Sequence, residues 1–242
     1  MPPETEMIEL PGDPPLSVRL KRSRQARRVS LRVSRLDGTI TLTVPARASV
    51  RNAIAFLNER RDWLDRAVAE TETPLAVVSG VAIPVEGRLL RVEPAAIRAA
   101  RIEGEHLLVP RQRPAAGALA FLRLQARDRL AERVAVHSAA LGRPTGKLTL
   151  RDTRSRWGSC TVTGDLMFSW RLIMAPPPIL DYVAAHEVAH LVEMNHSAAF
   201  WAQVQRLFPG YQEARRWLKS DGARLHRFRF DAAPGTSGHS AS

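Results

Sequence analysis

The segment that most constrains this chain reads His186-Glu187-Val188-Ala189-His190, and a further histidine follows at position 196. Residues four apart in a helix lie one above the other, so the imidazoles of His186 and His190 would stand about 6 Å apart, a separation that one metal ion can bridge. Glu187 lies about 100° further around the helix, which keeps its carboxylate off the metal but near a water bound to it. The pattern predicts a helix that carries a catalytic zinc site, with Glu187 as the general base.

The chain between the second and third histidines supports His196 as the third ligand. Asn195 is suited to a left-handed residue that ends the helix, and Ser197 can cap the next helix, so the chain should reverse and bring His196 back to the metal. A chance match in a helix rich in Ala and Val is the alternative. It is disfavoured because three of the seven histidines fall within residues 186–196 and each has a role.

The expected chemistry follows from this ligand set. Three neutral imidazoles leave Zn²⁺ its full charge and an open fourth position, so the pKa of a bound water can fall to about 7. Glu187 would accept the proton of that water as it attacks a peptide carbonyl, and would later deliver the proton to the leaving amine. The oxyanion needs a further donor, for which Tyr182, Arg156 and Ser159 are candidates. The structural alternatives are a packed aromatic for Tyr182 and a salt bridge to a carboxylate such as Asp181 for Arg156.

Other residues with chemical potential have plainer interpretations. Glu213 is an alternative third ligand, but His196 already fills that role. His137 falls on the inner stripe of a long helix, which favours a hydrogen-bonded core histidine over a catalytic one. Cys160 has no separate histidine to activate it and is expected to be a buried thiol.

Composition restricts the setting of the protein. Cys160 is the single cysteine, which excludes a disulfide within the chain and favours a reducing cytosol, so we expect a cytoplasmic protein. The first fifteen residues are acidic and proline-rich and do not resemble a signal peptide. No stretch approaches the roughly 18 continuous apolar residues of a membrane span, so no membrane partner is expected.

The net charge of +12 raises the question of nucleic-acid binding. The alternative is a solvated basic face, since arginine is abundant along the whole chain and no aromatic residue interleaves the run to stack on bases. Nucleic acid thus stays open as a partner of the N-terminal segment. The cations of the densest basic run are Lys21, Arg22, Arg24, Arg27 and Arg28.

Periodicity predicts the domain organisation. Residues 1–15 are expected to be a disordered tail, and residues 16–110 a β-rich subdomain with one helix from about Ser49 to Glu70 and a hairpin at Asp37-Gly38. Residues 111–222 should form the catalytic domain, with a long helix ended by Gly142 and a second hairpin around Gly164-Asp165 whose second strand runs to Ile173. Residues 223–242 are expected to be a C-terminal tail.

Several motifs, in their order along the chain, resemble the YgjP-like metallopeptidase domain family, which is similar to the SprT-like and WLM zincins. The resemblance covers roughly Leu16 to Gly222 and implies an α+β, minimal zincin fold, in which an antiparallel sheet packs on the long helix and the metal helix beside the N-terminal β-rich subdomain. It also implies a zinc-dependent peptidase, with His186, His190 and His196 as ligands and Glu187 as the catalytic glutamate. The metzincin group is excluded because every methionine precedes His196. The motifs are Arg156-Trp157-Gly158-Ser159-Cys160, Ser169-Trp170-Arg171-Leu172-Ile173, Asp181-Tyr182-Val183, the three histidines, Asn195-His196-Ser197 and Phe200-Trp201.

The sequence therefore predicts a zinc metallopeptidase that acts on a peptide or protein substrate. Two other hypotheses remain. One is a nucleic-acid-associated zinc protease or binding protein, and the other is a metal-stabilised interaction module without turnover.

Overall fold

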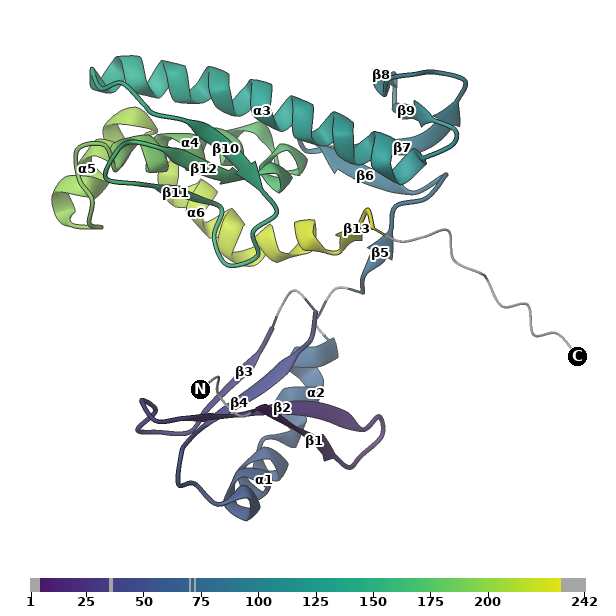
Figure 1. Cartoon of the computed structure of the whole chain (residues 1–242), viewed down its shortest axis with the longest axis vertical. Coiled ribbons are helices and arrows are strands. Elements are labelled where there is room, and N and C mark those ends of the chain that lie inside the picture. The colour runs from purple at the N-terminus through teal and green to yellow at the C-terminus, as the bar shows by residue number, and fades with distance from the viewer. Residues whose placement is uncertain (1–4, 35–36, 70, 72, 232–242) are drawn as a thin grey trace, which may run out of the picture. The chain divides into compact units, whose positions relative to one another are not determined.

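The computed structural model describes residues 5–34, 37–69, 71 and 73–231, and the chain divides into two compact units, which we call the N-terminal unit (residues 1–74) and the C-terminal unit (residues 75–242) (Figure 1). Each unit has its own cluster of buried apolar side chains. The sequence predicts the division after Pro110, and the structure has it after Pro74.

The N-terminal unit is built on a four-stranded sheet with the order β1-β2-β4-β3. β1 pairs antiparallel with β2, β2 parallel with β4, and β4 antiparallel with β3, which confirms the hairpin at Asp37-Gly38. The prediction of a disordered tail is wrong for β1, because Ile8 and Leu10 alternate into the buried face despite their acidic and proline-rich surroundings. The strands are β1 (Thr5–Leu10), β2 (Leu16–Ser23), β3 (Ser30–Val33) and β4 (Ile40–Pro45).

Two helices, α1 (Val50–Glu59) and α2 (Arg61–Ala69), stand where the sequence predicts one. Their apolar side chains, which include the fully buried Leu57 and Leu64, join the cluster on one face of the sheet. The helical conformation is interrupted at Arg60. The guanidinium of Arg61 donates to the carbonyl oxygens of Pro11 (2.7 Å) and Pro14 (2.5 Å). This tie between the start of α2 and the β1–β2 turn has no signature in helical periodicity.

The C-terminal unit contains a second four-stranded sheet, of order β6-β7-β9-β8. Its inward side chains, such as Ile83, Val92 and Leu107, belong to the same buried cluster as the long helix α3, and the backbone N–H of Glu86 donates to the carbonyl of Ile173 at 2.7 Å. These strands therefore pack with the metal-site half of the chain, which explains why the boundary lies before them. The strands are β6 (Ala82–Val85), β7 (Arg88–Ala95), β8 (Arg101–Glu103) and β9 (His106–Pro110).

Helices α3 (Pro114–Leu141) and α4 (Pro177–Ala189) form the centre of the C-terminal unit (Figure 1). The stripe predicted for α3 is buried at Leu122, Ala126, Leu130 and Val134, and Gly142 ends the helix in the left-handed conformation with φ of 69°. Prolines open both helices, where a missing N–H leaves no hydrogen bond unmade.

A three-stranded sheet with the order β10-β12-β11 lies beside α4. Its hairpin pairs β11 antiparallel with β12, but β10 runs parallel to β12, so the sheet is mixed and the prediction of an antiparallel sheet is wrong at this pair. The second strand of the hairpin ends at Ser169, and a 3-10 helix (Trp170–Met174) follows where the sequence predicts more strand. The strands are β10 (Leu148–Arg151), β11 (Gly158–Cys160) and β12 (Leu166–Ser169).

The C-terminal segment is folded as far as its last described residues. Helices α5 (Ala198–Leu207) and α6 (Tyr211–Ser220) are followed by a 3-10 helix (Gly222–His226) and strand β13 (Phe228–Arg229), which pairs with β5 (Leu75–Ala76). The prediction of a tail from residue 223 is therefore wrong for these elements, and residues 232–242 lie outside the described part. The buried Arg171 holds the segment by donating to the carbonyls of Leu225 (2.8 Å) and Phe228 (3.1 Å).

The expected α+β class is confirmed, since helices and small sheets share both cores. Across the described residues, no helix has both the length and the apolar character needed to cross a bilayer.

Candidate metal centre

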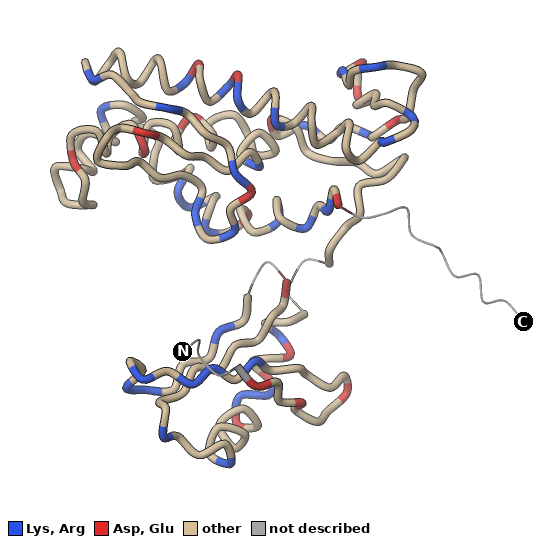
Figure 2. The backbone as a smooth tube through the Cα atoms, in the orientation of Figure 1, with Lys and Arg blue, Asp and Glu red and all other residues tan. Residues whose placement is uncertain are grey.

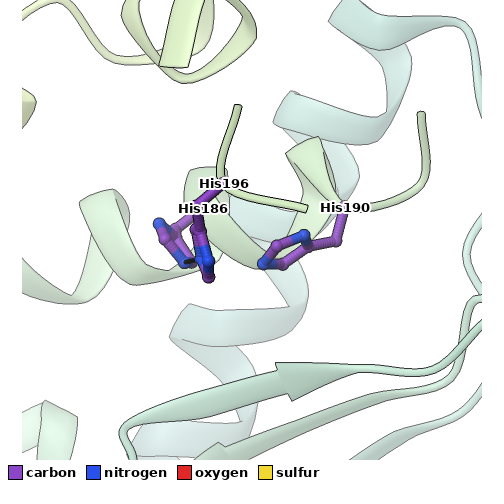
Figure 3. A group of neighbouring side chains, drawn as sticks. All are labelled: His186, His190 and His196. Atoms are coloured by element: carbon purple, nitrogen blue, oxygen red, sulfur yellow. Dashed lines mark hydrogen bonds between the residues drawn. The ribbon is translucent and has the colours of Figure 1, made fainter. Parts of the chain in front are cut away.

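Helix α4 and the loop after it present three histidines to one point (Figure 3). His186 lies in the last turn of α4, His190 is its C-cap residue, and their ring centroids are 5.1 Å apart. The loop returns His196 to the same place, with ring centroids 5.1 Å from His186 and 4.9 Å from His190. The reversal that the sequence predicts thus exists.

The loop achieves this return through side-chain caps. The Oδ1 of Asn195 accepts from the backbone N–H of Ser197 at 3.1 Å, and the Oγ of Ser197 accepts from the N–H of Phe200 at 3.3 Å at the start of α5. The cap at Ser197 is confirmed. The left-handed conformation expected at Asn195 is wrong, because Glu86 is the non-glycine residue with positive φ among those that the structure describes.

The three rings offer nitrogen atoms that all lie within 4.8 Å of one another. The Nε2 atoms of His186 and His196 are 3.1 Å apart. The Nδ1 of His190 lies 2.9 Å from the carbonyl oxygen of Glu193, and since a carbonyl can only accept, Nδ1 carries the proton and Nε2 is free to bind a metal.

Burial favours the neutral form of His186 and His190, which metal binding needs. Burial, together with the smaller effects of His190, His196 and Arg215, lowers the pKa of His186 to about 3. Burial likewise lowers the pKa of His190. Unprotonated imidazoles that converge without a carboxylate among them suit a borderline-soft divalent cation.

Glu187 lies beside this cluster and is 6% exposed. Burial raises the pKa of its carboxyl to about 8, and the positive charge of Arg156 acts in the opposite direction. The carboxyl is packed against strand β11, because a Cβ built on Gly158 would lie 2.6 Å from both Cγ and Oε1 of Glu187. Within the described part of the chain, β11 pairs with β12 on one side only, and its residue Gly158 lies against the carboxyl that the sequence predicts as the general base.

An aromatic wall encloses the histidines. The ring of Phe200 lies 4.9, 4.5 and 4.8 Å from His186, His190 and His196 respectively, and it is fully buried. Trp201 stacks on His196 at 5.9 Å and on Tyr211 at 5.2 Å. These contacts orient the imidazoles and exclude water from one side of the cluster.

A family model described as YgjP-like, metallopeptidase domain matches residues 27–221. The chain belongs to this family. Its membership confirms a metallopeptidase, a hydrolase of peptide bonds that depends on a metal ion. No curated protein matches the chain. Among solved structures, the chain is similar to the crystal structure of the metallopeptidase zymogen of Pyrococcus abyssi abylysin, with 22% identity, a TM-score of 0.33, and coverage of 40% of this chain and 95% of that one.

The YgjP-like domain arranges the other predicted site residues in different ways. Tyr182 is buried, and its ring meets that of His186 edge to face at 5.8 Å; burial raises the pKa of its phenol to about 12, so it stays protonated. Arg156 is exposed and precedes β11. The structural alternative for Arg156, a salt bridge to a carboxylate such as Asp181, is not found at Asp181, whose carboxylate accepts from Arg133 at 2.7 Å and lies 2.6 Å from His137 Nε2. This contact confirms His137 as a hydrogen-bonded core histidine.

Two alternatives for the YgjP-like site lose support. Glu213 lies on the exposed first turn of α6, outside the group of residues that converge as ligands. Burial raises the pKa of the Cys160 thiol to about 11, with the charge of Glu187 acting in the same direction, so the thiol is not a nucleophile.

Sequence reasoning missed three contributors to this site. The sequence indicates Phe200 and Gly158 only as parts of family motifs, and it gives no signal for Arg215, which lies 4.7 Å over the Trp201 ring. Helical spacing does not identify an aromatic residue or a glycine as part of a metal site. The family motifs that contain Gly158, Phe200 and Trp201 are the sequence signal that could have identified them.

Proposed function

We propose that the chain is a zinc-dependent peptidase in which His186, His190 and His196 hold one Zn²⁺ and Glu187 is the general base. The observation that carries this proposal is the convergence of three imidazoles, whose ligand atoms lie within 4.8 Å of one another, with the buried Glu187 carboxyl next to His186 on the same helix. When bound, zinc would supply Lewis acidity, which polarises a carbonyl and lowers the pKa of a water. Three histidines with an open fourth position are a typical donor set for catalytic zinc.

The chain's own groups would then move the protons. Glu187 accepts the proton of the attacking water and passes it to the leaving amine, which lets one carboxyl act as base and then as acid. Burial raises the pKa of this carboxyl, whereas a dication among the histidines favours its ionised form, so the base is active only in the loaded enzyme. Tyr182, as a protonated phenol beside His186, and Arg156, whose charge reaches Glu187, are the proposed oxyanion donors.

The substrate would be an extended peptide. The free edge of β11 can add one strand through backbone hydrogen bonds, which binds a peptide irrespective of its side chains. Such a peptide would run past the carboxyl of Glu187, since Gly158 on the same strand touches that carboxyl. The cytoplasmic location stays a prediction.

The test is the Glu187→Gln variant, examined by metal analysis and by cleavage of a peptide library. We expect one zinc per chain in the wild type and in the variant, with kcat/KM lowered by roughly 10²–10⁴-fold in the variant because the general base is lost. Glu213→Gln is the matched control and should keep both metal and activity. Full activity of Glu187→Gln would refute the role of this carboxylate.

The same experiment distinguishes the proposed peptidase from a metal-stabilised module without turnover. His196→Ala should lose both zinc and cleavage if the third ligand is correct. A wild type that binds zinc, is stabilised by it and cleaves no member of the library would instead favour the module, which family membership disfavours.

A further inference from the structure

The outer face of the sheet in the N-terminal unit gathers cations in register. Arg19 on β2 stands opposite Thr41 on β4, which stands opposite Arg32 on β3. Two residues further along β2, Lys21 continues the file on the same face. The loop that leaves β2 adds Arg24, Arg27 and Arg28, all exposed, and Figure 2 shows the basic colour gathered along this strand and loop. We call these residues the cationic face: Arg19, Lys21, Arg24, Arg27, Arg28 and Arg32.

The cationic face is not neutralised by acids of its own unit. Within the described residues, none of its six members has an ion pair or a side-chain hydrogen bond. On β1, Glu6 pairs with Leu20 and so falls in the opposite alternation to Arg19 and Lys21. Glu9 falls in the same alternation, pairs with Ser17 two residues before Arg19, and accepts a hydrogen bond from that serine hydroxyl. Cations without acidic partners repel one another and so destabilise the folded state slightly. Stability of the fold therefore does not explain why they lie together.

Neighbouring arginines show what a structural role looks like in this unit. Arg22, which the sequence includes in the basic run, is half-buried and donates to the carbonyls of Ala46 (3.2 Å) and Ala48 (2.9 Å). Arg61 pairs with Asp65 at 2.9 Å. We therefore leave Arg22 out of the cationic face and include Arg19 and Arg32, which lie outside the basic run but on the same face.

The chemistry of the cationic face suits a phosphate backbone. Cations two residues apart on a strand stand about 6.6 Å apart, and adjacent strands are about 4.8 Å apart, so the face offers a regular array of donors with threonine hydroxyls between them. Five of the six members are arginine, whose planar fork binds phosphate oxygens in pairs. The apolar side chains beside the array, Met7 (57% exposed) and Val29 (40% exposed), stand singly, so the face has no apolar centre of the kind that anchors a protein interface.

We propose that the cationic face binds the phosphate backbone of a nucleic acid without reading its sequence. Its six members are all cations, so affinity should come from the release of counterions from the phosphates rather than from stacking of bases on aromatic rings. This activity is separate from the proposed peptidase, and either can fail without the other.

The test measures binding of full-length protein to a labelled DNA duplex of mixed sequence by fluorescence anisotropy across a salt series. The triple variant Arg19→Gln, Lys21→Gln, Arg32→Gln is compared with a control that loses the same charge from the C-terminal unit, Arg111→Gln, Arg123→Gln, Arg127→Gln. We expect the first variant to lose at least 10-fold in affinity and about 3 units of the slope of log K against log salt, since each phosphate contact contributes about 0.9. The control should stay within about twofold of the wild type.

Three results would overturn the proposal: no binding of duplex by the wild type at about 50 mM salt, equal losses in both triple variants, or tighter binding to phosphatidylserine vesicles than to duplex. A second variant, Arg24→Gln, Arg27→Gln, Arg28→Gln, changes only the loop and must also weaken binding, which keeps the test decisive if the strand variant unfolds. Binding is measured without turnover, so a negative result here leaves the peptidase proposal unaffected, and an inactive peptidase leaves this one unaffected.

Discussion

Gly158 leaves space that the side chain of Glu187 occupies. Its backbone lies so close to Glu187 that a methyl group would meet Cγ and Oε1 at 2.6 Å. We predict that Gly158→Ala displaces the carboxyl and lowers kcat/KM by roughly 10–100-fold, because a misplacement on the order of 1 Å is enough to cost that much. Zinc content should not change, since the three atoms nearest to the new methyl group all belong to Glu187 and none to a metal ligand.

The matched control is Gly210→Ala. Gly210 has φ of −83°, and a Cβ there would meet only Phe208 at an ordinary 3.5 Å. Kinetics and metal analysis of both variants decide the matter: a Gly158→Ala enzyme with unchanged kcat/KM would mean that the position of this carboxyl does not limit the rate.

The histidines were predictable at this scale and their surroundings were not. Spacing along a helix determines which side chains share a face, so the pair at positions 186 and 190 follows from the sequence, and the cap residues Asn195 and Ser197 predict the return of His196. Phe200 touches all three rings only because the loop and α5 fold back over α4, and Arg215 reaches the site from a helix further along the chain. Such contacts depend on tertiary packing, which leaves no periodic signal.

Helices α3 and α4 are joined by Asp181, and this link should depend on pH. Burial raises the pKa of the Asp181 carboxyl, but hydrogen bonds from His137 and Arg133 outweigh it and leave the pKa below its ordinary value. The ionised carboxylate therefore stabilises the folded state fully above the unfolded pKa of about 4, and the stabilisation is lost as the pH falls through the folded pKa. We predict that Asp181→Asn lowers the free energy of unfolding by about 1–3 kcal/mol at pH 7, and that the difference from wild type shrinks below about pH 4.

Urea unfolding of metal-free protein from pH 7 to pH 3 measures this difference without a contribution from metal release. Asp128→Asn, an exposed position on α3, is the control and should stay within about 0.5 kcal/mol of wild type. A gap between wild type and Asp181→Asn that stays constant or widens on acidification would contradict the assignment.

At the level of secondary-structure elements, whether a segment is a helix or a strand was easier to predict than which strands pair. The long α3, the metal helix and both hairpins follow from periodicity and turn residues. The parallel pairs β2–β4 and β10–β12 do not, because parallel neighbours are joined by intervening chain rather than by a tight turn. The run from Trp170 to Met174 is buried at every residue, so its apolar pattern could not separate a strand from the 3-10 helix that forms.

At the level of the molecule, the sequence predicted two parts but not their boundary. Strands β6, β7 and β9 have the same alternating pattern as those of the N-terminal sheet, and alternation does not say which core a strand joins. Only packing assigns Ile83, Val92 and Leu107 to the cluster around α3. The same limit applies to β13, which pairs with β5 although more than 150 residues separate them (228 against 75).

The two separate cores lead to a last prediction, which concerns unfolding. Because each unit buries its own apolar cluster, calorimetry should resolve two transitions, and zinc should raise only the one that belongs to the C-terminal unit. Leu57→Ala, at a fully buried site in the N-terminal core, should cost about 2–5 kcal/mol and lower the other transition alone, by roughly 10 °C or more. Leu130→Ala, equally buried in α3, is the reciprocal control and should lower only the transition of the C-terminal unit.

Four of the five tryptophans (157, 170, 201 and 217) lie in the C-terminal unit, so fluorescence identifies which transition moved. A single transition that both variants lower equally would mean that the two cores unfold as one.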